Sequence, residues 1–599
     1  MTKHTASLSE RSIIHITAFI AALCSFAYEL IYSELLTVMY GGTVTQYGLT
    51  IGIFFSSLGI GSYLSEHFND EQHENFFRTE LYLSIIAPVG FLIIILVNTV
   101  TFPQYVPVVI LDVIARTPVI AIGILSGFEL PLLLAMGEKT NSTTNSQYQK
   151  QIAAKINSAL AVAMGTVFHT DNDQETYTQY STILAMDYIG GLAGALLFVF
   201  YLYPSVGLVS SIFILALFNT IAALLFSLRF STHSWGILTT PTDQITLTET
   251  KTIFVICLVV TAQYSLIAAN SETVNNEVST YYTENLIEQE YRTSTIETDV
   301  TTQYTTTYQK VTLYDRTWVG ETENPLFNGT TETCMRLDDA IQLCESWIEP
   351  YHNGLVDVPL SRSDNTTETN VLLVGGGDWI AANHLRDHNV NVEQVDIDGE
   401  FMNNMKNNSF VSPHHEDAYK YENLTTHQAD IYTHLQKTDT TYDHIILDLP
   451  GAKSDDLLHL YSTEFYTLLR EKLADDGTVS TWAYSEYVYG KHDKTLMNTL
   501  NESGFSSIAE YYAYGDYNGN GITTRGEKYI MLSPQKSPPQ SPVNAANGSQ
   551  YVRQYSNEYN QVTWKPIPTY NGLSANSIFS PNRQIIIPDN RLSRSESQE

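Results

Sequence analysis

Long apolar segments alternate with short polar segments over the first 270 residues of the chain. Seven of the apolar segments reach the length of about 17–25 residues, or somewhat more, that a helix needs to cross a bilayer. They lie near residues 13–38, 47–64, 80–102, 108–136, 182–202, 207–228 and 252–269. A secretory signal peptide would be a single short apolar segment with a cleavage site. The pattern therefore predicts an N-terminal all-α transmembrane bundle.

The pattern changes after residue 270. Residues 270–335 are rich in Thr and Tyr, and segments such as Tyr291–Thr298 and Tyr308–Tyr314 alternate in the manner of strands. They predict a small antiparallel β domain. Residues 535–599 contain many Pro, Asn and Ser and are expected to form an irregular tail. The resulting domains are 1–270 (membrane domain, about seven helices), 271–365 (small β domain), 366–535 (α/β domain) and 536–599 (C-terminal tail).

The α/β domain opens with the stretch Val371 to Asp398, which reads VLLVGGGDWIAANHLRDHNVNVEQVDID. Its order is strand, glycine turn, helix and strand, which is the first unit of a doubly wound parallel sheet. Further elements complete the domain: strands over Thr425–Asp430, Tyr442–Pro450 and Thr478–Tyr484, a long helix over Asp455–Leu473, and a closing antiparallel pair over Ile508–Tyr514 and Lys528–Ser533.

The glycine turn is a candidate ligand site. Glycine allows the backbone at Gly375 and Gly376 to approach a ligand closely, and the N–H groups at the following helix start can face it. Asp396 ends the second strand, where a carboxylate can accept from both hydroxyls of a ribose. The alternative is a plain tight turn with a surface acid. Together the turn and the acid indicate a nucleoside ligand.

Composition narrows the classes of partner. The 599-residue chain has a formal net charge of −33, although only 16% of its residues are charged. Nucleic-acid binding needs a basic face, so it is not expected. The acid excess fits a surface adapted to high salt or one that attracts cations.

Lysine and arginine positions predict the orientation in the membrane. They occur at the N-terminus and in every second gap between the apolar segments, which places the N-terminus in the cytoplasm. Seven crossings would then place the chain after residue 270 outside. Cys334 and Cys344 could form a disulfide there. Residues 152–168 are predicted to be an interfacial amphipathic helix, and an eighth crossing at this segment would return the C-terminal domain to the cytoplasm.

The ordered motifs resemble the polyamine aminopropyltransferases, the spermidine synthase family. The resemblance covers roughly residues 290–535 and rests on TTTYQKVTLY, MRLDDAIQLCESWIEPYHNGLVDVPL, VLLVGGGD, VDID, QADI and YDHIILDLPGAKSDDLLHLYSTEFYTLLREKLADDG. The runs SFAYEL, GFELPLL and DYIGGLAGALLF are similar to the subgroup with an N-terminal multi-pass membrane domain. The implied fold is a class I methyltransferase-like Rossmann domain.

The resemblance implies a membrane-bound enzyme that moves a propylamine group from decarboxylated S-adenosylmethionine to a diamine such as putrescine. The products would be spermidine and methylthioadenosine. No permanently bound cofactor and no metal are expected, and a homodimer is compatible with the family. The implied site residues are Asp448 and Tyr351 for catalysis, His352 and Asp378 for the polyamine, and Gln309, Gly375, Gly376, Asp396, Asp430 and Ile431 for the nucleoside.

Some positions depart from the family pattern. Gly451 stands where a second acid usually grips the diamine, and Lys453 would repel a polyamine. Trp379 replaces a small residue and could narrow the amine pocket. The alternative to an enzyme is therefore a catalytically degenerate polyamine-binding or transport-linked membrane module. A methyltransferase is a third candidate because the fold is shared, although Gln309 and Tyr351–His352 argue against it.

Overall fold

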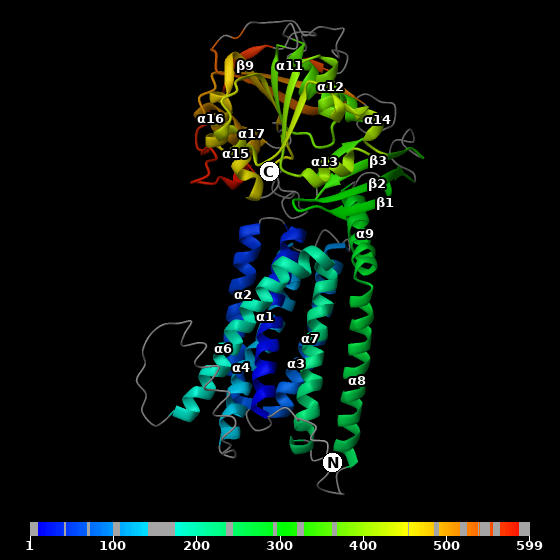
Figure 1. Cartoon of the computed structure of the whole chain (residues 1–599), viewed down its shortest axis with the longest axis vertical. Coiled ribbons are helices and arrows are strands. Elements are labelled where there is room, and N and C mark those ends of the chain that lie inside the picture. The colour runs from blue at the N-terminus through cyan, green and yellow to red at the C-terminus, as the bar shows by residue number, and fades with distance from the viewer. Residues whose placement is uncertain are drawn as a thin grey trace. The chain divides into compact units, whose positions relative to one another are not determined.

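The computed structural model forms two compact units, one of residues 1–40 and 44–282 and one of residues 41–43 and 283–599, and each is described by itself (Figure 1). The residues described are 10–40, 43–68, 72–99, 108–141, 174–234, 244–290, 296–319, 329–338, 340–361, 368–452, 455–483, 490–515, 524–536, 538, 552–554 and 563–585. The expected helix at 152–168 and Lys453 lie outside them.

The first unit is helical, and each of the seven predicted apolar segments falls mainly in one of its helices. These are α1 (Glu10–Tyr40), α2 (Thr43–Leu64), α3 (Gln72–Thr99), α4 (Val108–Asn141), α6 (Gln174–Leu197), α7 (Tyr203–Ser234) and α8 (Gln244–Ala269), followed by α9 (Ser271–Glu290). Short turns η1 (Ser65–Phe68) and η2 (Phe198–Leu202) follow α2 and α6. The predicted small β domain was wrong for residues 271–290, which form a helix.

By length and apolar composition, five helical stretches of the described chain could cross a membrane, or up to six if α8 and α9 form one bent span. One of the five, Tyr180–Ser227, has 48 residues and contains two of the predicted segments. Gly207, with φ +77°, interrupts its helical geometry. Because a 48-residue helix is far longer than one crossing needs, the turn at Gly207 accounts for one of the missing crossings. The other depends on whether α8 and α9 form one bent span.

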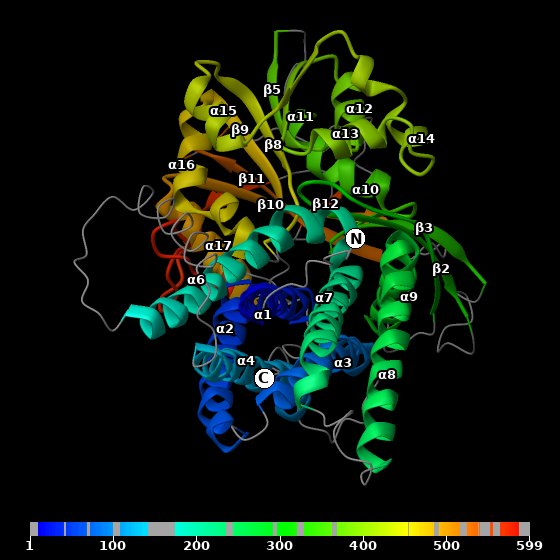
Figure 2. The ribbon, with the colours of Figure 1, turned by 60° about the horizontal axis from the view of Figure 1, so that its bottom comes forward.

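Close backbone contact holds the helices of this unit together. Helix α1 packs against α3, α4, α6 and α7 (Figure 2). A Cβ atom built on Gly190 or Gly194 of α6 would lie 2.4 Å from Phe19 O or 2.1 Å from Leu23 O of α1. Only glycine therefore allows this approach, as small residues do at helix interfaces in membranes.

Polar side chains inside the bundle are paired. Arg116 forms an ion pair with Asp112, one turn away, and its Nη2 donates to Gln46 Oε1 at 2.8 Å. Asn219 Nδ2 donates to Glu80 Oε2 at 2.7 Å. Such pairing is expected where charged and polar groups lie among apolar helices, because an unpaired one is costly to bury.

The second unit begins with a four-stranded antiparallel sheet in the order β1 (Ile296–Thr305), β2 (Lys310–Trp318), β3 (Thr331–Leu337) and β4 (Ala340–Cys344). Cys334 and Cys344 face each other across β3 and β4 and form a disulfide. The predicted antiparallel sheet is therefore present. Short helical turns follow it: α10 (Ile348–His352), η4 (Asn353–Asp357) and α11 (Val358–Leu360).

A larger sheet forms the centre of the second unit. Its described strands run in the order β12-β10-β11-β9-β8-β5-β6-β7, with β13 beside β10. Five neighbouring strands of this sheet are parallel to one another: β5 (Asn370–Gly375), β6 (Asn391–Asp396), β7 (Leu424–Gln428), β8 (Tyr442–Asp448) and β9 (Leu473–Ala483). Strands β10 (Ser507–Gly515) and β11 (Thr524–Ser533) pair antiparallel with each other. Strand β5 buries both faces, which explains its uninterrupted apolar run.

Helices connect the parallel strands as the sequence predicts. They are α12 (Ile380–Asp387), α13 (Gly399–Met405), α14 (Ser412–His415), α15 (Ile431–Lys437), α16 (Thr463–Glu471) and α17 (Gly490–Glu502), with the short turns η5 (Ala418–Lys420) and η6 (Asp455–Tyr461). The single long helix expected over Asp455–Leu473 is in fact two elements. Ser462 separates them because its side chain caps α16 by accepting from Phe465 N.

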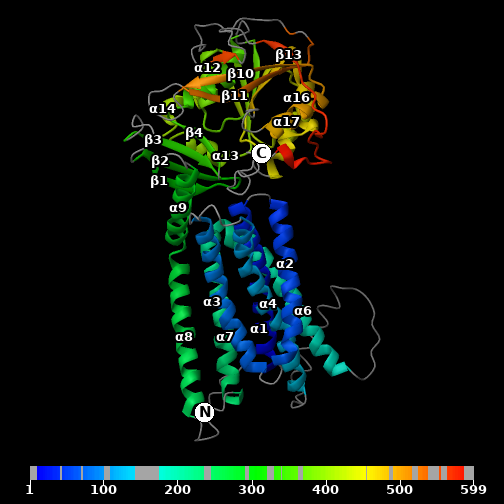
Figure 3. The ribbon, with the colours of Figure 1, turned by 180° about the vertical axis from the view of Figure 1, so that it is seen from behind.

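The C-terminal segment is more ordered than its composition suggests. Strands β12 (Val552–Gln554) and β13 (Trp564–Pro566) pair with β10 (Figure 3), and η9 (Arg583–Ile585) follows. The buried Asn576 donates from Nδ2 to Leu458 O at 2.8 Å and to Tyr461 O at 3.0 Å. The expectation of an irregular tail was wrong for these residues, because composition does not show which strand edge a segment can pair with.

Candidate active site

The site lies where the strand order of the parallel sheet reverses. Strands β5 and β8 are neighbours, and Gly375 pairs with Asp448. Gly375 has φ +83°, and a Cβ atom there would lie 2.1 Å from Asp448 O. Gly376 has φ +69°, and its Cβ would lie 3.2 Å from Asp448 Oδ2. Both predicted glycines are thus needed to pass the turn over the end of β8, at the edge where such sheets bind ligands.

Three predicted residues meet at this point. One side-chain ligand atom each from His352, Asp378 and Asp448 lies within 4.8 Å of the other two. Asp378 follows the glycine turn, and its Oδ1 accepts from Ile380 N at 3.0 Å. Tyr351, from α10, donates from its hydroxyl to Asp448 Oδ1 at 2.9 Å. The ligand atoms of His352, Asp378 and Asp448 would suit an ammonium group or a metal ion.

Burial raises the pKa of the carboxylates of the site, and neighbouring charges add to this effect at Asp448. Burial, followed by the charges of Asp378 and Asp396, raises the pKa of Asp448 to about 8. Burial raises the pKa of Asp378 to about 6. It also raises the pKa of Tyr351 well above its usual value, and the neighbouring Asp448 adds to this effect. At neutral pH the site therefore favours a bound proton or another cation.

Asp396 lies at the end of β6 beside the glycine turn, as predicted. A Cβ atom on Gly377 would lie 2.8 Å from Asp396 Oδ2. Its Oδ1 accepts from Asp398 N at 2.8 Å. Burial, more than any neighbouring charge, raises the pKa of Asp396 to about 6. This is the position at which a carboxylate reaches a ribose in doubly wound sheets.

Gln309 reaches this edge through a residue that the sequence did not single out. Gln309 Nε2 donates to Asp398 Oδ2 at 3.1 Å, and Thr306 Oγ1 donates to the same oxygen at 2.5 Å. Asp398 is only 2% exposed and also caps α13 by accepting from Phe401 N at 3.0 Å. The sequence signal for the capping role of Asp398 is that a helix starts directly after VDID, because an acid at this position can cap the helix.

Asp430 and Ile431 follow β7, next to β6. Asp430 Oδ1 accepts from Thr433 N at 2.9 Å, so the carboxylate caps α15. Ile431 is 6% exposed and packs in the hydrophobic core. Ala429 N donates to Asp396 O at 3.0 Å, which brings this segment beside Asp396. Their predicted contact with the adenine remains a prediction, and the side chain of Ile431 serves the core.

Trp379 does not narrow the amine site, contrary to the prediction. Its backbone has φ +71°, its side chain is 3% exposed, and Nε1 donates to Met402 O at 2.8 Å. The indole therefore packs in the hydrophobic cluster that includes Phe401 and Met402. The left-handed backbone of this residue turns its side chain into that core, which the side-chain size alone could not indicate.

Residues 348–523 match the spermine/spermidine synthase domain family. The chain is 24% identical over 527 residues to the polyamine aminopropyltransferase of Leptospira interrogans, covering 87% of this chain and 88% of that protein. It is 25% identical over 500 residues to the polyamine aminopropyltransferase of Oceanobacillus iheyensis, covering 82% of each. The crystal structure of spermidine synthase from Thermotoga maritima matches with 18% identity and a TM-score of 0.31, over 45% of this chain and 81% of that one.

Proposed function

Residues 348–523 are a spermine/spermidine synthase domain in a chain similar to the polyamine aminopropyltransferases, and on this premise we propose that the protein transfers an aminopropyl group to an amine. The donor is decarboxylated S-adenosylmethionine and the acceptor is a diamine such as putrescine. The products are spermidine and methylthioadenosine. The observation that carries the proposal is the meeting of His352, Asp378 and Asp448 beside the glycine turn.

The chemistry needs a carboxylate beside the acceptor amine. A free alkyl amine has a pKa near that of lysine, about 10.4, so at neutral pH it arrives as ammonium. Asp448 takes one proton, and the freed lone pair forms an N–C bond to the propyl carbon. The C–S bond breaks and its electron pair stays on sulfur, which becomes a neutral thioether. Asp378 holds the amine, and Tyr351 orients Asp448 through its hydrogen bond.

On the donor side, Asp396 would bind the ribose hydroxyls, and the glycine turn would lie against the nucleoside. Gln309 is anchored by Asp398 at the same edge of the sheet. Asp430 would accept from the adenine amino group. These roles are supported by the positions of the residues at the carboxyl ends of neighbouring strands β5, β6 and β7.

The test is methylthioadenosine release by the purified full-length chain with decarboxylated S-adenosylmethionine and putrescine. Asp448→Asn should lower kcat at least about a hundredfold, because it removes the proton acceptor. The matched control is Asp443→Asn at the other end of β8, where an Asn oxygen can still accept from Asn370 N. Equal losses in both variants would contradict the proposed role of Asp448.

Gly451 favours a second candidate. It is buried and brings no acid to the position where the family usually has one. A polyamine-binding or transport-linked membrane module would retain the cation site without transfer. Polyamine binding without methylthioadenosine release at any salt concentration would favour this alternative over the enzyme.

We also propose that the first unit spans a lipid bilayer with its N-terminus in the cytoplasm. Large apolar side chains exposed on α2 support this, such as Phe55, Ile60 and Tyr63, which are 50%, 52% and 69% exposed. Helices α1 and α8 begin at the same end of the bundle (Figures 1 and 3). This arrangement supports an odd number of crossings and an extracellular second unit, and the disulfide Cys334–Cys344 agrees with an oxidising compartment.

A further inference from the structure

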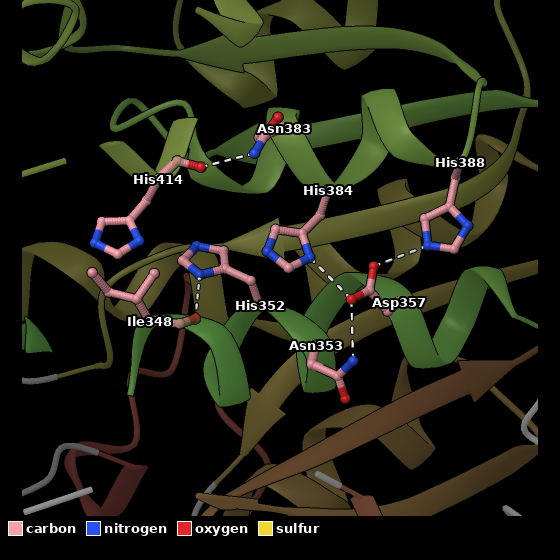
Figure 4. A network of polar contacts seen from close by, with 8 residues as sticks. All are labelled: Ile348, His352, Asn353, Asp357, Asn383, His384, His388 and His414. Carbon is pink, nitrogen blue, oxygen red and sulfur yellow. Dashed lines mark hydrogen bonds and ion pairs between the residues drawn. The ribbon is translucent and has the colours of Figure 1, made fainter. Parts of the chain in front are cut away.

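The rings of His414, His352, His384 and His388 form a row (Figure 4). In this histidine row, His352 is the residue that also belongs to the site with Asp378 and Asp448. Asp357 bridges two rings of this row: its Oδ2 lies 3.0 Å from His384 Nδ1, and its Oδ1 lies 2.9 Å from His388 Nε2. Asn353 Nδ2 also donates to Asp357 Oδ2 at 3.1 Å. A carboxylate with three donors is held in one orientation, and it holds the rings that bind it.

The charged forms of Asp357 and His384 favour each other. Burial raises the pKa of Asp357, but the hydrogen bonds from His384 and His388 outweigh it and lower that pKa to about 2. Burial lowers the pKa of His384, but the hydrogen bond and charge of Asp357 outweigh it, so the pKa is raised above its usual value. Glu349 and Asp387 also face His384 and add to this effect. His384 is therefore an imidazolium over a wider pH range than a free histidine.

The ring of His384 stacks on that of His352, with centroids 5.4 Å apart and planes inclined by 24°. His352 is fully buried, and its Nδ1 lies 2.8 Å from Ile348 O. A carbonyl oxygen only accepts, so Nδ1 carries the proton. Burial, followed by the charge of His384, lowers the pKa of His352 to about 3; Asp357 opposes this shift and His414 adds to it. Its ring is therefore neutral.

The remaining nitrogen of His352, Nε2, is buried, and no residue that the structure describes forms a hydrogen bond with it. Because the proton is on Nδ1, Nε2 presents a lone pair. One ring nitrogen of His352 and one carboxylate oxygen each of Asp378 and Asp448 form a set of three ligand atoms within 4.8 Å of one another. A primary ammonium group has three N–H donors, which matches this set.

We propose that His384, held by Asp357, is a positioning residue that keeps His352 neutral, so that Nε2 of His352 accepts a hydrogen bond from the acceptor amine. This inference rests on the proposed function for the identity of the ligand. If His352 gained a proton, Nε2 would become a donor, and the ring charge would repel the ammonium. Burial disfavours this protonation, the charge of His384 adds to that effect, and Asp357 balances that charge and limits its effect on the amine.

The first test compares the pH dependence of kcat/KM for putrescine in the wild type and in His384→Gln. The ratio of variant to wild type should be within about twofold at pH 9 and fall about tenfold by pH 5.5, since only the variant protonates His352 in this range. Asp357→Asn, which removes the charge that stabilises the His384 imidazolium, should change the ratio in the same direction. In His388→Gln, which keeps the stacked pair, the ratio should not depend on pH.

A double variant separates positioning from a structural role. In a His352→Gln background the acceptor no longer titrates, so adding His384→Gln should have no further pH-dependent effect. An equal loss at all pH values, or a pH-dependent effect that persists in this background, would overturn the proposal.

A second readout does not depend on catalysis. Nitrogen-15 NMR of histidine-labelled protein should show that His352 titrates at higher pH in His384→Gln than in the wild type. If the wild type releases no methylthioadenosine, the proposed function fails, but this titration still decides whether His384 controls the charge of His352. An unchanged titration would overturn the inference even in an active enzyme.

Discussion

At the scale of single residues, the site is defined by carboxylates whose charged forms are disfavoured by burial. Asp378, Asp396 and Asp448 influence one another at the end of β5, β6 and β8, and the pKa values of all three are raised. Buried like charges remain together only when a proton or cation neutralises them. The feature that disfavours the fully ionised site would, under the proposed function, favour the binding of a cationic amine.

The raised pKa of Asp448 predicts the pH dependence of the reaction. The group must be deprotonated to accept a proton, so kcat/KM for putrescine should rise with pH through about 8. It should then level off until the amine itself loses its proton near about pH 10. Initial rates of methylthioadenosine release between about pH 5.5 and 9.5 test this. A flat profile across this range would contradict the role of Asp448.

At the scale of elements, the sequence predicted the type and order of most strands and helices. Val371–Asp398 gave a strand, turn, helix and strand because apolar periodicity and turn glycines are local properties. It did not predict that η6 and α16 are separate, or that residues 271–290 are helical. It also missed Lys528, whose burial depends on elements that are distant in sequence.

Lys528 joins three elements through an ion-pair network. Its side chain is 2% exposed, and Nζ of this β11 residue lies 2.8 Å from Asp493 Oδ1 of α17 and 2.8 Å from Glu510 Oε1 of β10. Lys528→Met should lower the free energy of unfolding by about 3–5 kcal/mol, because it removes the buried cation with which the carboxylates of Asp493 and Glu510 pair.

Lys565 provides the matched control for this substitution. It also pairs with Glu510, but its side chain is 51% exposed. Lys565→Met should cost less than about 1 kcal/mol, because solvent screens an exposed pair. Denaturant unfolding followed by circular dichroism would compare the two variants. Similar shifts in the midpoint would show that burial does not set the strength of this network.

At the scale of the whole molecule, the chain combines an apolar helical unit with an α/β unit in an acidic protein of net charge −33. The acidic excess is the reason why no nucleic-acid partner is expected. Where the second unit lies relative to the membrane depends on the number of crossings, and residues 152–168, at which an eighth crossing would lie, are outside the described residues. An experiment on sidedness therefore bears on both.

An epitope tag after residue 599 should be cleaved by protease added to intact cells, because seven crossings place the C-terminus outside. A tag before residue 1 should remain protected under the same conditions. After cell lysis both tags should be cleaved, which controls for accessibility to the protease. Protection of both tags in intact cells would instead indicate an even number of crossings and a cytoplasmic second unit.

The sequence by itself determined the apolar segments, the doubly wound α/β domain and the set of acids at strand ends, because periodicity, turn glycines and strand boundaries are written locally. It also placed Asp378, Asp396 and Asp448 among the candidate site residues. Only the tertiary structure decided which of these groups meet: β8 lies beside β5 although β6 and β7 come between them in the chain. That crossover brings Asp448 to Gly375 and Tyr351, and the packing of α10 and η4 against α12 places the histidine row behind them. Local sequence cannot encode which side chains come into contact, since this depends on burial and on the packing of segments far apart in the chain.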